Sequence, residues 1–61
     1  MPVIIMESAQ LSKEQKQHLV KEFTESAARI TGLSEKSFYV FLKENSIDNI
    51  GVGGKLISNR K

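Results

Sequence analysis

The second residue of the chain has the chemistry of a proton-transfer catalyst. Pro2 follows Met1 and precedes the apolar run Val3–Met6. An initiator methionine is ordinarily removed before a residue as small as proline, and the chain would then begin with a secondary amine. The pKa of an α-amino group is about 8, and desolvation at an interface lowers it. We therefore expect Pro2 to act as a neutral general base, although proline at this position is common and by itself unspecific.

Other side chains with reactive chemistry are few. The single histidine, His18, has no second ligand at metal-binding spacing, so we interpret it as a solvated helix residue and expect no metal. Glu44 stands at the end of an expected strand, and we assign it a structural hydrogen bond. The run Gly51–Lys55 lacks the earlier glycine and the following Ser or Thr of a phosphate-binding loop. This run indicates a tight turn, and no cofactor is expected.

The length of the chain limits its core. With 61 residues the chain allows one domain, residues 1–61. Domains of this size bury a small fraction of their surface and are commonly stabilised by disulfides, a metal or partner subunits. The chain has no cysteine and one histidine, yet 39% of its residues are hydrophobic. We therefore expect a homo-oligomer.

The charge balance argues against several classes of partner. Nine basic and seven acidic residues give a net charge of +2, which gives no case for nucleic acid or an anionic membrane surface. No apolar stretch approaches the roughly 20 residues of a membrane helix, and residues 1–6 lack the basic leader of a signal sequence. The absence of cysteine fits a reducing compartment, so we expect a cytoplasmic protein.

The first half of the chain predicts a strand and a long helix. Residues Pro2–Glu7 favour a strand that is apolar on both faces. Ser12 and Gln15 have the spacing of a capping box, and Gly32 suits the left-handed position after a helix. These limits predict a helix over residues 13–31. Its apolar stripe consists of Leu19, Val20, Phe23, Ala27 and Ile30.

The second half predicts a parallel partner strand and a hairpin. Phe38–Leu42 is rich in aromatic and β-branched residues and predicts a strand. The order strand, helix, strand predicts a right-handed crossover between two parallel strands. Asn45–Asn49 is expected to be a loop, and Ile50–Gly54 followed by Lys55–Ile57 predicts a hairpin. The expected fold class is α+β: one β-α-β unit with a C-terminal hairpin.

Four features occur in order across the whole chain: Pro2, the helix start Ser12–Lys16, the apolar second strand ending at Glu44, and the run Gly51–Gly54. In this combination the chain resembles the 4-oxalocrotonate tautomerase family, whose subunits are about this length. The resemblance implies a dimer with a four-stranded sheet backed by two helices, and a homohexamer built as a trimer of dimers. It also implies a cofactor-independent reaction in which an N-terminal proline moves a proton of an enol or 2-oxo acid. Pro2 matches that proline.

Three positions depart from the family pattern. Family members that act on dicarboxylates carry an arginine before the helix-capping serine, where this chain has Leu11. A second arginine usually lies in the second strand of these members, at the position aligned with Tyr39 in this chain. An aromatic residue usually precedes the glycine run, and here that residue is Ile50. Arginines bind carboxylate and stabilise charge on oxygen, and leucine can do neither.

These departures change the expected substrate and pocket. We expect a less charged substrate and an apolar pocket formed by Leu11 and Ile50. The Tyr39 hydroxyl could donate a hydrogen bond to the reacting oxygen, although an aromatic residue in a strand more often serves packing. A cation could come from elsewhere in the subunit or from a neighbouring one, with Arg29, Lys43 and Arg60 as candidates.

Two other hypotheses stay open. The loss of both arginines would also suit a non-catalytic member that keeps the fold for assembly alone. A small DNA-binding dimer would need a basic, exposed strand and a second helix. The apolar Val3–Met6 and the turn-rich residues 44–61 argue against that alternative.

Overall fold

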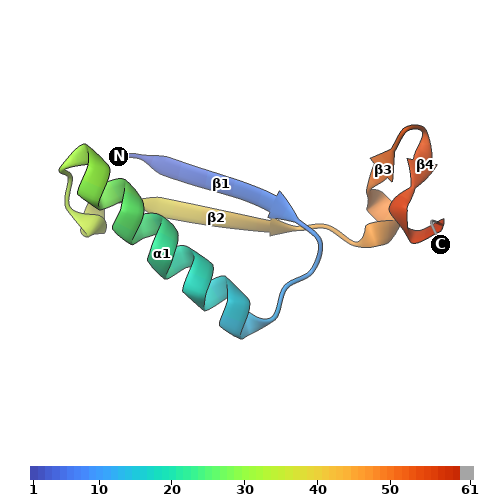
Figure 1. The fold of residues 1–61 in the computed structure, drawn as a ribbon, viewed down its shortest axis with the longest axis horizontal. Helices are drawn as coiled ribbons and strands as arrows, with labels where there is room; N and C mark the ends of the chain where they lie inside the picture. The colour runs from blue at the N-terminus through green and yellow to red at the C-terminus, as the bar shows by residue number, and fades with distance from the viewer. Residues whose placement is uncertain (60–61) are drawn as a thin grey trace.

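The computed structural model describes residues 1–59 as a β-α-β unit followed by a hairpin. Strand β1 (Val3–Ser8) is followed by helix α1 (Lys13–Thr31) and strand β2 (Tyr39–Glu44). The two strands are parallel neighbours, and α1 covers one face of this sheet (Figure 1). The predicted β-α-β unit with parallel strands is confirmed.

The C-terminal hairpin forms its own small sheet. Strand β3 (Gly51–Val52) pairs antiparallel with β4 (Lys55–Leu56). Gly53 and Gly54 between them have φ angles of 62° and 85°, and positive values at both positions are what a type I′ turn requires. Figure 1 shows the hairpin beyond the C-terminal end of β2, away from α1. Three 3₁₀ turns complete the described chain, at Glu35–Ser37, Ile47–Asn49 and Ile57–Asn59.

Helix α1 begins and ends where the sequence predicts, because local hydrogen bonds specify both ends. The Gln15 backbone N–H donates to Ser12 Oγ at 3.0 Å, and the Ser12 N–H donates to Gln15 Oε1 at 3.0 Å. This is the complete capping box. At the other end Gly32 adopts φ 79°, and its N–H donates to the carbonyl of Ala28 at 2.9 Å.

Both strands end later than their apolar runs predict. The predicted ranges were Pro2–Glu7 and Phe38–Leu42, whereas the ladder pairs Val3 with Tyr39 at one end and Ser8 with Glu44 at the other. Backbone pairing continues through these last polar positions because the ladder depends on main-chain groups. Hydrophobicity locates the strands, and pairing sets their ends.

The face of the sheet opposite α1 is apolar and uncovered within one chain. Side chains alternate along both strands, and the half-buried set faces the helix. On the other side lie Val3, Ile5, Tyr39 and Phe41, which are between 45% and 55% exposed. We call these four residues the open face. No other part of residues 1–59 buries these apolar side chains, and a contiguous exposed apolar patch is typical of an interaction surface.

Two residues of the predicted apolar stripe are exposed: Val20, at 39%, and Ile30, in the last turn of the helix. Ile30 is 77% exposed, whereas Phe23 and Ala27 are half-buried. The helix has 19 residues and is about 28 Å long, whereas a six-residue strand spans about 20 Å. The last turn of α1 therefore extends past the sheet that would cover it, as Figure 1 shows.

The isolated chain is too open to be a compact monomer. None of the side chains described in residues 1–59 is fully buried. The accessible surface is 5020 Å², whereas a folded monomer of this mass exposes about 4,000 Å². The radius of gyration is 14.8 Å, against about 10.5 Å for a compact domain of this length. Both differences agree with the expected need for partner subunits.

Two structural features bear on the remaining hypotheses. Within residues 1–59, α1 is the only α-helix and β1 is apolar, so the described chain lacks the second helix and the basic strand of a small DNA-binding dimer. Among residues 1–59, no helical segment has the apolar length that spanning a bilayer requires.

Candidate active site

Pro2 lies at the end of the parallel sheet where strands β1 and β2 begin. It immediately precedes β1, and its carbonyl accepts a hydrogen bond from the Tyr39 N–H at 3.1 Å. This bond fixes the backbone of Pro2 through the carbonyl and leaves the nitrogen out of the ladder. Pro2 itself is half-buried, so its ring is partly shielded from water. A proline within the chain has no backbone N–H, so its nitrogen makes no ladder hydrogen bond.

Tyr39 is the candidate site residue that lies at the same end of the sheet as Pro2. It pairs with Val3 in the ladder, and both side chains lie on the open face. The Tyr39 side chain is 50% exposed, so its hydroxyl is not committed to a packed core. The register of the strands therefore places Tyr39 at the same end of the sheet as Pro2.

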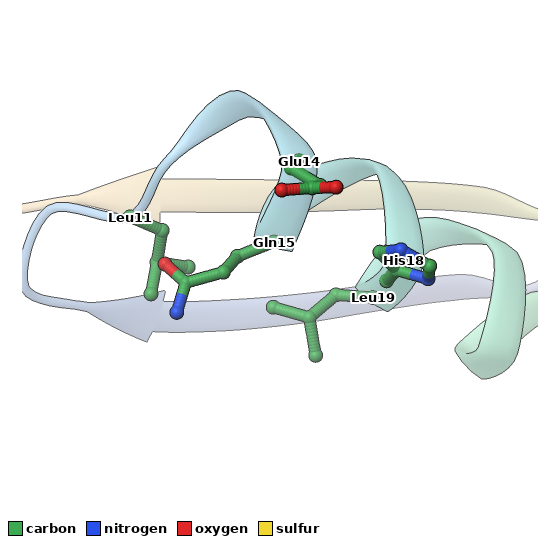
Figure 2. A pocket seen from close by; sticks show the side chains of 5 residues that line it. All are labelled: Leu11, Glu14, Gln15, His18 and Leu19. Carbon is green, nitrogen blue, oxygen red and sulfur yellow. The ribbon is translucent and has the colours of Figure 1, made fainter.

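Leu11 lies at the opposite end of the sheet, where β1 leads into α1. It lines a groove of about 380 Å³ together with Glu14, Gln15, His18 and Leu19. Figure 2 shows Leu11, Gln15 and Leu19 pointing to one side of the helix. The groove has apolar walls at Leu11 and Leu19, and a carboxylate and an imidazole at its rim.

Ile50 lies near that same end of the sheet but in a different hollow. This second hollow, of about 330 Å³, is lined by Glu7, Ser8, Asn45, Asn49, Ile50 and Gly51. Its lining is mostly polar, so within one chain Ile50 and Leu11 do not form a shared apolar pocket. The amides of Asn45 and Asn49 were not singled out from the sequence, because loop asparagines give no specific signal.

The four candidate residues thus fall into two pairs at opposite ends of the sheet. Pro2 and Tyr39 lie where β1 and β2 begin, and Leu11 and Ile50 lie beyond the points where these strands end. A strand of six residues separates the pairs by about 20 Å. Figure 1 shows the same separation between the N-terminus and the hairpin. No small substrate can contact both pairs within one chain.

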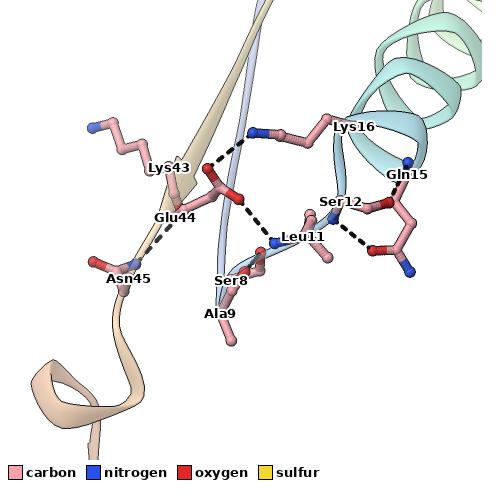
Figure 3. A network of polar contacts seen from close by, with 9 residues as sticks. All are labelled: Ser8, Ala9, Leu11, Ser12, Gln15, Lys16, Lys43, Glu44 and Asn45. Carbon is pink, nitrogen blue, oxygen red and sulfur yellow. Dashed lines mark hydrogen bonds and ion pairs between the residues drawn. The ribbon is translucent and has the colours of Figure 1, made fainter.

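Glu44 joins the end of β2 to the start of α1. Its Oε2 accepts a hydrogen bond from the Leu11 N–H at 2.8 Å, and its Oε1 accepts one from Lys16 Nζ at 3.1 Å (Figure 3). The backbone hydrogen bond from Leu11, followed by the Lys16 ammonium, holds the pKa of Glu44 below its ordinary value. The predicted structural hydrogen bond is present. Its two donors, the Leu11 N–H and the Lys16 ammonium, were not predicted from the sequence.

The candidate cations do not gather at either pair. Arg29 is exposed in the last turn of α1, and Lys43 pairs with Glu7 in the ladder near the Leu11 end. Figure 3 shows the Lys43 side chain pointing away from the Glu44 carboxylate. Arg60 lies outside the described residues. Within residues 1–59 no group of three His, Cys, Asp or Glu side chains could hold a metal ion.

Comparisons with known proteins agree with this architecture. Residues 2–60 match the model of a family described as "Tautomerase enzyme". A protein of Bacillus cereus named "Probable tautomerase" is 35% identical over 49 residues, which cover 80% of each chain.

Solved structures extend the similarity to the fold. DmpI from Archaeoglobus fulgidus superposes with a TM-score of 0.87 at 34% identity, covering 95% of this chain and 100% of that one. A structure described as a 4-oxalocrotonate tautomerase homologue superposes with a TM-score of 0.91 at 31% identity, covering 100% of this chain and 98% of that one.

Proposed function

The chain belongs to the tautomerase family, as a relative of the 4-oxalocrotonate tautomerases, and from this premise we propose that it catalyses keto–enol isomerisation without a cofactor. The catalytic base is the amine of Pro2 after removal of Met1, and the substrate is an enol or a 2-oxo acid. The observation that carries the proposal is the position of Pro2 at the head of β1, held by its carbonyl with its nitrogen outside the ladder.

The proposed reaction uses the amine as a proton shuttle. The neutral Pro2 nitrogen accepts the proton of the enol hydroxyl, and the resulting ammonium donates a proton to the substrate carbon, which regenerates the amine. In the intact chain this nitrogen belongs to an amide and has no available lone pair. The proposed mechanism therefore requires removal of Met1, which is 83% exposed.

The proposed site is shared between subunits. Residues 1–61 form one tautomerase-like domain, and the Pro2 and Tyr39 end of one copy meets the Leu11 and Ile50 end of a neighbour. Three observations support this arrangement: the separation of the two pairs, the uncovered open face, and the accessible surface about 1,000 Å² above that of a compact monomer. We propose a dimer with a four-stranded sheet, and a homohexamer of three such dimers.

The proposed substrate is less charged than a dicarboxylate. Leu11 stands in an apolar groove whose rim carries Glu14, and the hollow at Ile50 contains Glu7. A carboxylate near each pocket residue would repel a second carboxylate of the substrate. Lys16, the cation nearest to Leu11 in the hydrogen-bond network of Figure 3, is already paired with Glu44.

The decisive experiment is ketonisation of an arylenolpyruvate by protein whose intact mass shows loss of Met1. The Pro2→Ala variant should lose roughly 100-fold or more of the rate, because a positioned general base contributes about that much. Glu22→Gln, an exposed substitution in the middle of α1, is the matched control and should keep the rate. A trimmed oligomer with no rate above buffer would instead support the non-catalytic alternative.

A further inference from the structure

Glu44 connects the end of β2 to the loop that holds Leu11 and to the start of α1. The residue lies at the last position of β2, and its hydrogen bonds reach Leu11 and Lys16, respectively 33 and 28 positions away in the sequence. Its two oxygens are used separately, one for each donor (Figure 3). A single carboxylate therefore fixes the backbone of the loop before α1 and the side chain of a lysine in the first helical turns.

The two donors have different relations to the groove: Leu11 lines it, and Lys16 supplies a positive charge near it. The Leu11 N–H belongs to a residue that lines the groove, so its hydrogen bond sets where that wall stands. Lys16 supplies the ammonium that shares the carboxylate with Leu11, and its side chain is 36% exposed. Lys16 lies outside the lining of the Leu11 groove and borders a separate hollow with Lys13, Gln17 and Val20, so Glu44 is the group that holds its ammonium beside the loop of Leu11. Without Glu44 the ammonium would lose this described partner. It could then turn toward a negatively charged ligand.

We propose that Glu44 is a positioning and specificity-determining residue: it fixes Leu11 in the wall of the substrate groove and holds Lys16 away from the substrate. This inference rests on the proposed function and deepens it, because it explains how a groove beside a lysine selects against a second carboxylate. The Lys16–Glu44 pair has no net charge, so the groove presents leucine and not a cation. Glu44 itself does not touch the substrate.

The specificity half of the proposal is tested by ligand binding and does not require turnover. The probes are two unreactive dienes, the dicarboxylate muconate and the monocarboxylate sorbate. The Glu44→Gln variant should bind muconate more tightly relative to sorbate by about fivefold, because it frees one partly exposed ammonium. The double variant Glu44→Gln with Lys16→Met should lose this gain. Glu22→Gln and Lys21→Met change the same charges elsewhere on α1 and serve as controls.

The positioning half is tested by Glu44→Ala against Glu44→Gln. Alanine removes the acceptor for the Leu11 N–H, whereas glutamine keeps a carbonyl oxygen there. We expect faster hydrogen exchange at the Leu11 amide in Glu44→Ala and near wild-type exchange in Glu44→Gln. In catalysis, Glu44→Ala should raise KM for an arylenolpyruvate with kcat little changed, and glutamine should restore KM.

Each result supports or overturns the inference. An unchanged muconate-to-sorbate ratio in Glu44→Gln, or a gain that survives the Lys16→Met substitution, would overturn the specificity role. Unchanged Leu11 exchange in Glu44→Ala would overturn the positioning role. Failure of the proposed function is a separate outcome, since it would appear as absent catalysis while exchange and binding still report on Glu44.

Discussion

The two ends of the β1–β2 sheet are built in different ways. At the end where Pro2 lies, the Tyr39 N–H donates to the Pro2 carbonyl, and the neighbouring side chains are exposed and apolar. At the far end, the Asn45 N–H donates to the Ser8 carbonyl at 2.8 Å, and Glu44 binds both a loop amide and a lysine. The far end is organised by hydrogen bonds within one chain, whereas the Pro2 end leaves apolar side chains exposed.

The two ends differ in the interactions that organise them. Charge-assisted hydrogen bonds at the far end fix a wall that one subunit can preform. The open face beside Pro2 gains its packing only when apolar surface is removed from water by a neighbour. In the proposed shared site, a preformed wall from one copy would meet a reactive end completed by association.

The largest expected effect comes from placing a charge on the open face. Ile5→Asp should dissociate the assembly and reduce ketonisation roughly 100-fold or more, because an unpaired carboxylate cannot be buried at an apolar interface without a penalty of several kcal/mol. Light scattering measures the mass, and the enol assay measures the rate. Ile5→Val keeps the apolar character and should leave both near wild type. An Ile5→Asp oligomer of unchanged mass would show that the open face is not an interface.

A mixing experiment tests directly whether the two ends act in trans. Pro2→Ala and Leu11→Asp subunits should each be nearly inactive, since each damages one end. Co-refolded in equal amounts, they should regain about a quarter of wild-type activity, because random pairing joins an intact Pro2 end to an intact Leu11 end in about one site in four. A site formed within one chain would regain nothing.

Acid should weaken the far end selectively. The folded-state pKa of Glu44 lies below its ordinary value, so its stabilising contribution is complete above the unfolded-state pKa and is lost as pH falls through the folded-state pKa. Urea unfolding between neutral pH and about pH 3 should therefore show a smaller acid loss of stability in Glu44→Gln than in wild type. Parallel curves for the two proteins would show that Glu44 does not contribute to the acid response.

The smallest expected effects are on the free energy of unfolding, when one serine hydroxyl is removed at each end of the sheet. Ser12→Ala removes the N-cap of α1 and should lower the free energy of unfolding by about 1 kcal/mol. Ser34→Ala removes a similar bond, from the Lys36 N–H to Ser34 Oγ at 3.2 Å, but that bond caps a three-residue turn and should matter less. Urea unfolding of both variants measures the difference. Equal losses would contradict the view that the far end is the more tightly organised.

Sequence reasoning succeeded where structure depends on neighbours along the chain. The limits of α1 follow from Ser12, Gln15 and Gly32, which act within one turn of the helix ends. The hairpin follows from Gly53 and Gly54, whose positive φ angles need no tertiary partner. Strand ends were displaced by one or two residues, because β pairing joins segments far apart in sequence and continues past the apolar runs.

The arrangement of the candidate site was beyond the reach of the sequence. Pro2 as a base, and Leu11, Tyr39 and Ile50 as pocket residues, stay predictions, and the pairing of these residues into two ends emerged only from the fold. The Glu44 network also depends on the fold, since nothing in the spacing of a carboxylate and a loop amide 33 positions apart predicts a bond.

The sequence by itself determined the β-α-β order, the capped helix and the glycine turn, and it predicted partner subunits. These properties follow from local backbone preferences and from a hydrophobic content that so short a chain cannot bury. Only the tertiary structure decided that Pro2 and Leu11 lie at opposite ends, that the open face is uncovered, and that Glu44 neutralises Lys16 beside Leu11. Such relations depend on strand register and crossover geometry, which bring together groups that are distant along the chain.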